Sequence, residues 1–465
     1  MKMKGEGNKM NNPQIKNPKA LLFSLCFVLM FSVMNGTMFN IAIPDIAEAF
    51  SLLPSEVSWV MTGYIMIYAV GALVYGKLTD TIALKTLITF GLIVFSLGSL
   101  IGFIAPNYGF VLMARVIQAI GGSMIPAIAF IAPIRYFPNE RGKILGIISS
   151  VMAFASGIGP ILGGVIGGFL SWQYLFLTSA FIIITLPFLR ANLPDEKTKY
   201  VKLDYIGGSL VASLIVLSLM GITLGQSWTL FIVMILAILV VFRMKKAKDP
   251  FIPPHLFKNS NYVVTLLVSF ISVACLFGLM FSVPIMLRDV YELSTLQIGL
   301  AMFPGAMSAA LIGRKGGQLV DQKGSRMIFL VSLLLLLTGF LVVSTTVGTH
   351  PVIFSLSLVF PMMCFPLVQS SGADLLAGIL SQKETGVGMG VFNLLNFVSG
   401  ALSGALVGKV LDIYRPDYPL NPLGVIDSGA VYSNVFIVFM VLILVGFIVF
   451  KFFHHSPLQT KTESP

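Results

Sequence analysis

Charged side chains that interrupt long apolar stretches are the residues of this 465-residue chain best suited to chemistry. Arg115 and Asp374 each lie well inside such a stretch. An ionised group in the centre of a bilayer costs roughly 2.5–3.5 kcal/mol on insertion scales, so it needs a partner or a water-filled cavity. Ionisable residues inside membranes often mark proton or ion pathways. We therefore predict that Asp374 carries a proton and that Arg115 biases the protonation of a nearby acid.

Asp45 is the second acid that we consider for proton coupling, because it directly follows Pro44 at the end of the first apolar stretch. Both acids also have a plainer interpretation. Asp374 could lie at the cytoplasmic end of its helix and face water, and Asp45 could be an exposed loop acid. The sequence leaves these alternatives open.

Uncharged polar residues within apolar stretches are candidates for substrate binding. A pocket for a drug-like molecule is mostly apolar, with a few polar groups that orient the ligand. Each of these residues could equally form a hydrogen bond between helices, worth about 0.6 kcal/mol in a membrane. The candidates are Asn35, Asn40, Gln118, Gln369, Asn393 and Asn396.

The residue patterns of common enzyme sites are missing from the sequence. It has neither a Walker-type glycine loop nor an HExxH string, so ATP hydrolysis and metalloproteolysis have no visible site. Its three cysteines, Cys26, Cys275 and Cys364, are spread over separate apolar stretches and show no metal-binding or disulfide spacing. We expect neither an enzyme nor a resident metal or cofactor.

The elements that position these side chains are mostly apolar stretches of about 20 residues. Hydrophobic residues make up 56% of the chain and charged residues 11%, compared with about 25% charged in soluble domains. About 20 apolar residues cross the ~30 Å bilayer core as a helix, whereas the continuous run 328–343 does not fit the alternating pattern of a β-barrel. We predict an all-α membrane protein with 14 transmembrane helices. They are expected near 20–43, 57–79, 87–106, 108–132, 143–168, 172–190, 204–224, 228–243, 261–287, 296–313, 326–347, 351–378, 384–408 and 432–453.

The net charge of +11 is explained by membrane topology. Of the 30 Lys and Arg residues, 26 fall in the tails and in the loops on one side of these spans, and three fall on the other side. Basic residues concentrate on the cytoplasmic side of membrane proteins. This distribution predicts a multi-pass protein of the cell membrane with both termini in the cytoplasm, and it removes the need for a nucleic-acid partner.

A short motif occurs twice and indicates two similar halves. Gly76 and Asp80 stand in a Gly-x-Leu-x-Asp string between the second and third spans, and Gly317 and Asp321 stand in the same string between the tenth and eleventh. Repeated halves are common in transporters, with the substrate path between them. We predict six-helix bundles over 20–190 and 261–453, an inserted helix hairpin with linkers over 191–260, and cytoplasmic tails at 1–19 and 454–465.

This repeated string resembles the inner-loop signature of the major facilitator superfamily. The resemblance implies a gating role for Asp80 and Asp321, whose carboxylates would cap a helix and hold one conformation. The string from Leu112 to Gly121, which contains Arg115, is similar to the fourth-helix motif of proton-driven exporters in that superfamily.

A glycine-rich string in the fifth span resembles the motif that distinguishes antiporters from importers in the superfamily. It consists of Gly157, Gly159, Pro160, Gly163 and Gly164. Glycines allow helices to pack closely, and the proline removes a helical hydrogen bond. The resemblance implies export.

The string 35–44 resembles the first-helix motif of the 14-helix drug–proton antiporters, and the likeness to tetracycline exporters of Gram-positive bacteria runs nearly end to end. The chain departs from those exporters at Asn35, Ser156 and Gly400, where they carry acids. The resemblance implies a proton-coupled exporter of an amphipathic drug, with tetracycline as a metal chelate, and Mg²⁺ carried with it, as the leading substrate.

Two other functions stay open at this point. The nearest alternative is a multidrug or lipophilic-cation efflux pump, and the paucity of acids in the spans argues against a cation cavity. An alternative of another class is a membrane sensor or scaffold that does not transport. The expected partners are a small drug molecule, protons and membrane lipid, with one chain sufficient to form the pathway.

Overall fold

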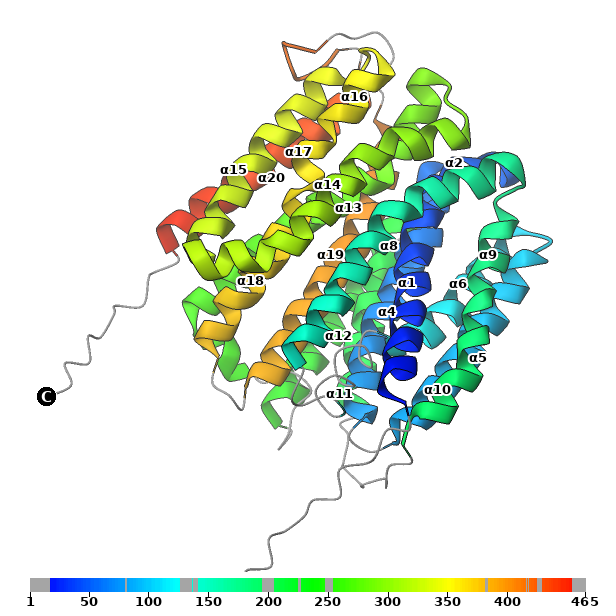
Figure 1. Ribbon diagram of the computed structural model, residues 1–465. Helices are drawn as coiled ribbons and strands as arrows, with labels where there is room; N and C mark the ends of the chain where they lie inside the picture. Colours follow the sequence, from blue (N-terminus) through cyan, green and yellow to red (C-terminus); the bar gives the residue numbers. More distant parts are fainter. Residues whose placement is uncertain are drawn as a thin grey trace, which may run out of the picture.

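The computed structural model describes residues 17–79, 82–125, 136, 141–194, 205–224, 227–246, 254–380, 384–414, 416, 418–424 and 429–453. Every regular element in these ranges is a helix, and Figure 1 shows the helices side by side in an elongated bundle. The first group is α1 (Pro18–Ile41), α2 (Ile43–Phe50), α3 (Pro54–Val57), α4 (Trp59–Leu78), α5 (Leu84–Phe103), α6 (Tyr108–Gly122), α8 (Arg141–Phe169), α9 (Gln173–Ala180), η2 (Phe181–Thr185) and α10 (Leu186–Asn192). The second group is α11 (Tyr205–Leu224), α12 (Ser227–Lys246), η3 (Pro254–Lys258), α13 (Ser260–Tyr291), α14 (Thr295–Lys323), α15 (Ser325–Thr346), α16 (Pro351–Ser357), α17 (Val359–Met362), α18 (Cys364–Ile379), α19 (Thr385–Ile413) and α20 (Ala430–Phe453).

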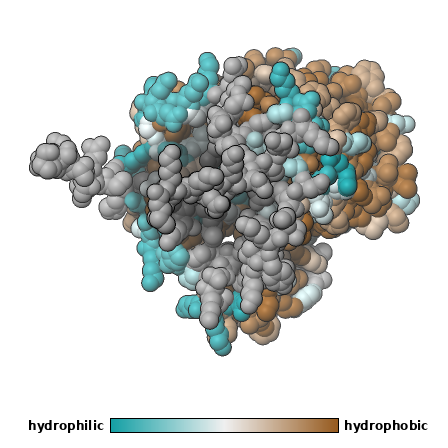
Figure 2. Space-filling model, turned by 60° about the horizontal axis from the view of Figure 1, so that its bottom comes forward, coloured by the Kyte–Doolittle hydropathy of each residue, from teal (hydrophilic) through white to brown (hydrophobic). Residues whose placement is uncertain are grey.

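Nine helical segments within the described ranges are long and apolar enough to cross a membrane. Large apolar side chains also stand on the outside of the bundle, for example Phe188, Phe231 and Leu311, each more than half exposed. Figure 2 shows apolar residues over the flank and hydrophilic ones around the end turned toward the viewer. The all-helical membrane fold is thereby confirmed. The count of 14 spans, the inserted hairpin and the domain boundaries stay predictions.

Several helices extend beyond the limits that the apolar pattern predicts, α14 and α19 the furthest. α14 ends at Lys323 instead of residue 313, and α19 ends at Ile413 instead of residue 408. Hydropathy marks where a helix leaves the lipid, but the helix itself ends only at a residue that breaks it, here Gly324 with φ 82°. Gly317 and Asp321, expected in a loop, therefore lie on the last turns of α14.

The first span is divided into two helices, and this division places Asp45. α1 begins at the end of the bundle that we call the near end, and α2 lies at the opposite, far end (Figure 1). Pro44 stands in the first turn of α2, where its missing N–H is tolerated. The break at Ala42 leaves Asp45 in the first turn of the new helix, directed toward the turn that joins α13 to α14.

The glycine-rich string of α8 lies where this helix contacts both α1 and α14. A Cβ on Gly159 would lie 1.8 Å from Oγ1 of Thr37, and one on Gly164 would lie 3.1 Å from Cα of Gly299. A Cβ on Gly299 would lie 2.6 Å from the carbonyl oxygen of Pro160. The surroundings of Gly157 lie outside the described side chains. Small residues at these positions bring the backbones of α8 and α14 together.

We predict opposite effects of alanine at two glycines of α14. Gly299→Ala should lower stability by roughly 1–3 kcal/mol, because the new methyl group meets the backbone of α8. Gly317→Ala should be neutral or stabilising by up to about 1 kcal/mol, because no atom lies within 4 Å of its Cβ and alanine favours the helix. Thermal unfolding of the purified variants in detergent measures both effects. Equal shifts in the two variants would contradict the close crossing.

Candidate functional site

Arg115 is held by three hydrogen bonds in the interior of the first helix group. Its side chain extends from α6 and is 2% exposed. Nε donates to the carbonyl oxygen of Val60 on α4 at 3.0 Å. Nη1 donates to Oδ1 of Asn35 on α1 at 2.9 Å and to Oε1 of Gln118 at 3.0 Å. One guanidinium group thus connects α1, α4 and α6.

Two serines orient the amide groups around Arg115. Asn35 donates through Nδ2 to Oγ of Ser179 on α9 at 2.7 Å, and Gln118 donates through Nε2 to Oγ of Ser99 on α5 at 2.7 Å. Because the amide nitrogens are engaged in this way, both amide oxygens are directed at the guanidinium group. Asn35 and Gln118, predicted to bind substrate, are fully buried and have these protein groups as partners.

Aromatic rings complete the surroundings of Arg115. Its guanidinium carbon lies 4.3 Å from the ring centroid of Phe39 and 3.9 Å from that of Tyr64. Arginine over an aromatic face is attracted by the negative face of the ring. Among the described residues, the contacts of Arg115 are therefore neutral groups, and the acid that the sequence led us to expect beside it is not one of them.

A row of aromatic rings leads from Arg115 to α19. The rings of Tyr64 and Tyr68 lie 5.5 Å apart, and Tyr68 meets Phe397 of α19 edge to face at 5.6 Å. These three residues could not be singled out from the sequence, because an aromatic residue in an apolar helix carries no sign of whether it faces lipid, core or substrate. Together they connect the buried cation with the second helix group.

Gln369 and Asn396 form a polar pair beside this aromatic row. Asn396 of α19 donates through Nδ2 to Oε1 of Gln369 on α18 at 2.9 Å. Oδ1 of Asn396 is buried and has no partner among the described residues. Two of the six predicted substrate-binding residues thus contact each other outside the Arg115 cluster. The Oδ1 of Asn396 is a hydrogen-bond acceptor that a ligand could use.

The other predicted residues are dispersed. Asn40 is buried on α1 with its Oδ1 unpartnered in the described part of the chain, and Asn393 is exposed on α19. Asp374 is exposed on α18, and Asp321 is exposed near the end of α14. Asp80 lies outside the described residues.

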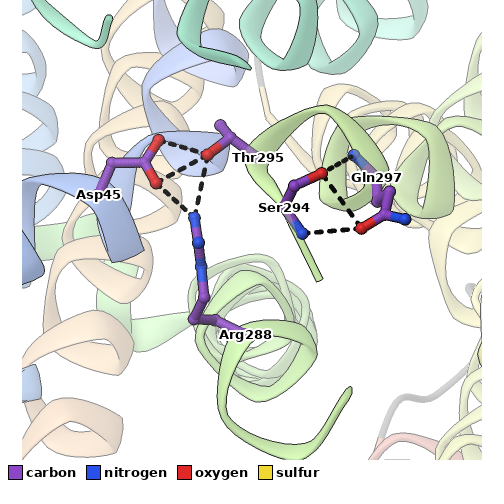
Figure 3. A network of polar contacts seen from close by, with 5 residues as sticks. All are labelled: Asp45, Arg288, Ser294, Thr295 and Gln297. Atoms are coloured by element: carbon purple, nitrogen blue, oxygen red, sulfur yellow. Dashed lines mark hydrogen bonds and ion pairs between the residues drawn. The ribbon is translucent and has the colours of Figure 1, made fainter. Parts of the chain in front are cut away.

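Asp45, Arg288 and Thr295 form a polar cluster at the far end, which we call the far-end latch (Figure 3). Arg288 donates through Nη2 to Oδ1 of Asp45 and, at 3.0 Å, to Oγ1 of Thr295. The Thr295 hydroxyl lies 2.7 and 2.6 Å from the two carboxylate oxygens. Asp45 comes from α2, whereas Arg288 and Thr295 come from α13 and α14. The latch therefore joins the two helix groups.

Local structure fixes the α13–α14 side of the latch. Ser294 and Gln297 form a capping box at the start of α14, in which the backbone N–H of Ser294 donates to Oε1 of Gln297 at 2.9 Å (Figure 3). Burial raises the pKa of the Asp45 carboxyl, while the hydrogen bond from Thr295 and the charge of Arg288 act in the opposite direction. Asp45 therefore takes up a proton at higher pH than an exposed aspartate does.

A second polar contact joins the two helix groups at the far end. The backbone N–H of Ser55, in the first turn of α3, donates to Oδ1 of Asp412 on α19 at 3.1 Å. Next to it, a Cβ on Gly408 would lie 2.9 Å from the carbonyl oxygen of Pro54. With the latch and the α8–α14 crossing, this contact closes the far end.

Comparison with known proteins supports a transporter family. The model of the Major Facilitator Superfamily matches residues 25–404. The chain is 25% identical to the multidrug efflux pump SdrM of Staphylococcus aureus, over 89% of this chain and 94% of that protein. It is 29% identical to the riboflavin transporter RibZ of Clostridioides difficile, over 68% and 71%. The fold is similar to the crystal structure of the human organic anion transporter MFSD10, with a TM-score of 0.64, 16% identity, and coverage of 93% and 100%.

We predict that Arg115→Lys destabilises the protein although it keeps the charge. Lysine has a single ammonium group and cannot reach the Val60 carbonyl and both amides in the planar geometry of the guanidinium. The expected loss is about 2 kcal/mol, comparable to one hydrogen bond with a charged group. Thermal unfolding measures the loss, with Arg190→Lys as the matched control, because Arg190 is exposed and its one hydrogen bond within the described residues is to Thr89 at 3.1 Å. A shift no larger than that of the control would contradict the role of the cluster.

Proposed function

Because the chain belongs to the Major Facilitator Superfamily, we propose that it exports amphipathic organic molecules by alternating access in exchange for protons. The far-end closure is the observation that carries this proposal. Two helix groups meet there through an ion pair, a backbone-to-carboxylate hydrogen bond and a glycine crossing, all of which can separate without covalent change. A transporter needs such reversible closure at each end of its path.

The near end faces the cytoplasm in this proposal. The distribution of 26 basic residues against three supports it through the positive-inside rule. The far end is then external, so the structure represents a state that is closed to the outside. The glycine-rich string of α8 forms part of this closure, which agrees with the role in antiport that its resemblance implies.

Asp45 and Asp374 are the acids that we propose for proton exchange. Asp45 is a partly buried acid at the external end, where it contacts both helix groups. Asp374 stands on α18, five residues before the helix ends on the cytoplasmic side. Proton uptake at one acid and release at the other would couple the external closure to the proton gradient, which supplies about 2.3 kcal/mol per proton for each 100 mV.

The chemistry of the interior between the helix groups favours neutral or anionic amphipathic substrates over lipophilic cations. Arg115 is a buried cation whose contacts are neutral groups, so its positive potential opposes a second cation in the same low-dielectric interior. The aromatic row and the Gln369–Asn396 pair would supply stacking and one polar contact. The relatives that are multidrug or riboflavin transporters support a broad, flat, amphipathic substrate. Tetracycline as its Mg²⁺ chelate is the specific candidate.

Reconstitution tests this function directly. In proteoliposomes with an imposed pH gradient, we expect addition of tetracycline with Mg²⁺, or of riboflavin, to move protons, whereas the cation ethidium moves few. Asp374→Asn should abolish this proton movement by removing the titratable group, while the amount of folded protein stays unchanged. Glu463→Gln, an acid-to-amide change in the C-terminal tail, is the control. Proton movement at the wild-type rate in Asp374→Asn would exclude Asp374, and no response to any substrate would contradict export.

Asp45→Asn should weaken the external closure. The amide keeps a hydrogen-bonding group near Thr295 but removes the charge that pairs with Arg288. The expected cost is about 1 kcal/mol, near the upper value for partly exposed ion pairs, which lowers the ratio of closed to open molecules about fivefold. Distances between spin labels at Leu53→Cys and Ile413→Cys measure this population. Glu48→Gln on the same helix is the matched control, and an unchanged distance distribution in Asp45→Asn would refute the latch.

A further inference from the structure

An apolar slot with a volume of about 580 Å³ lies between α4, α5, α6 and α11. Its walls are aliphatic and aromatic side chains with a few hydroxyl groups, and none of the lining residues that the structure describes is charged. Three side chains at its rim stand open to the surroundings: Val74 is 40% exposed, Phe90 54% and Ile120 40%. The slot therefore opens on the lipid-facing flank of the bundle, away from the Arg115 cluster.

The floor of the slot is closed by close packing of α4 on α6. A Cβ on Gly71 would lie 2.1 Å from Oγ of Ser123, so the two backbones leave no passage at this point. The lining residues from α5 come from the start of that helix, including Leu87 and Phe90. The slot therefore lies in the near-end half of the apolar belt, next to one leaflet of the membrane.

The helix that forms the outer wall of the slot is attached elsewhere. α11 packs against its neighbour α12 and contacts α19 more extensively than α4. Val211 and Ile215 share a buried cluster with Leu394 and Ala401 of α19 and with Met66 and Ala69 of α4. Ala212 and Val216, on another face of α11, line the slot. α11 is thus joined to α19 and, less extensively, to α4, and an apolar gap separates it from α5 and α6.

We propose that the slot is a binding site for one acyl chain of a membrane phospholipid. A polar drug would find no charged group and few hydrogen-bonding groups to orient it there, whereas a hydrocarbon chain needs neither. Acyl chains are the apolar molecules present at this depth of the membrane. A hydrocarbon chain can also adapt its conformation to changes in the width of the gap between α11 and α5–α6, which a packed side chain would resist. The site is independent of the proposed export activity.

Photolabelling of the full-length protein in nanodiscs tests this site without a transport assay. The probe is a phosphatidylglycerol with a diazirine in the middle of one acyl chain, and mass spectrometry of peptides locates the adducts. We expect adducts on α4, α5 and α11 to exceed those on α20 severalfold. Native mass spectrometry after detergent extraction should retain one phospholipid per chain.

Val216→Phe fills the slot, so it should reduce the α4 and α5 adducts severalfold and remove the retained phospholipid. The matched control is Val441→Phe on α20, which adds the same bulk at a 46% exposed position and should leave both readouts unchanged. Phe90→Ala widens the slot without adding bulk and should keep or increase labelling. Adducts spread evenly over α20 and the slot in the wild-type protein would overturn the proposal. So would displacement of the probe by tetracycline or riboflavin, which would assign the slot to substrate.

Discussion

The buried Arg115 guanidinium imposes the central constraint on this structure. A permanently charged group inside an apolar bundle is stable only if every direction in which it donates meets an acceptor or an aromatic face. The protein meets this need with a backbone carbonyl, two amides and two rings taken from α1, α4 and α6. Because Asn35 and Gln118 are themselves fixed by serines of α9 and α5, one charge determines how five helices pack. One buried cation therefore holds these five helices of the first group together.

This cluster has consequences for how the two groups can move. Their contacts at the far end are of a different kind from the Arg115 cluster: the latch side chains are partly exposed, and the glycine crossing depends on backbone contact. The latch itself costs little to separate, because water can solvate Asp45 and Arg288 once they part. Motion is therefore expected between the groups and not within the first one. The latch lies between the two groups at the far end, where they must separate for that end to open.

The sequence predicted the helical membrane fold well because long apolar runs leave few alternatives, and it located Arg115 because a charge in such a run is conspicuous. It could not predict the partners. Arg288 pairs with Asp45 across more than two hundred residues, and no local pattern encodes that contact. Tyr68 and Phe397 were missed because their environment is tertiary. Asp321 was placed in a loop because hydropathy reports the edge of the lipid and not the end of a helix.

The arrangement of charges also bears on coupling. Arg115 is the fixed charge of the interior, whereas the acids available for protonation lie toward the two ends, Asp45 at the far end and Asp374 on α18. In the proposed exchange, the fixed positive charge of Arg115 would disfavour a further proton near it. The proposed proton transfer would then rely on a conformational change that exposes each acid in turn. The aromatic row from Tyr64 through Tyr68 to Phe397 links that central charge to α19, so a molecule bound beside it contacts both groups at once. Occupancy of the path and closure of the far end then depend on the same relative position of the two helix groups.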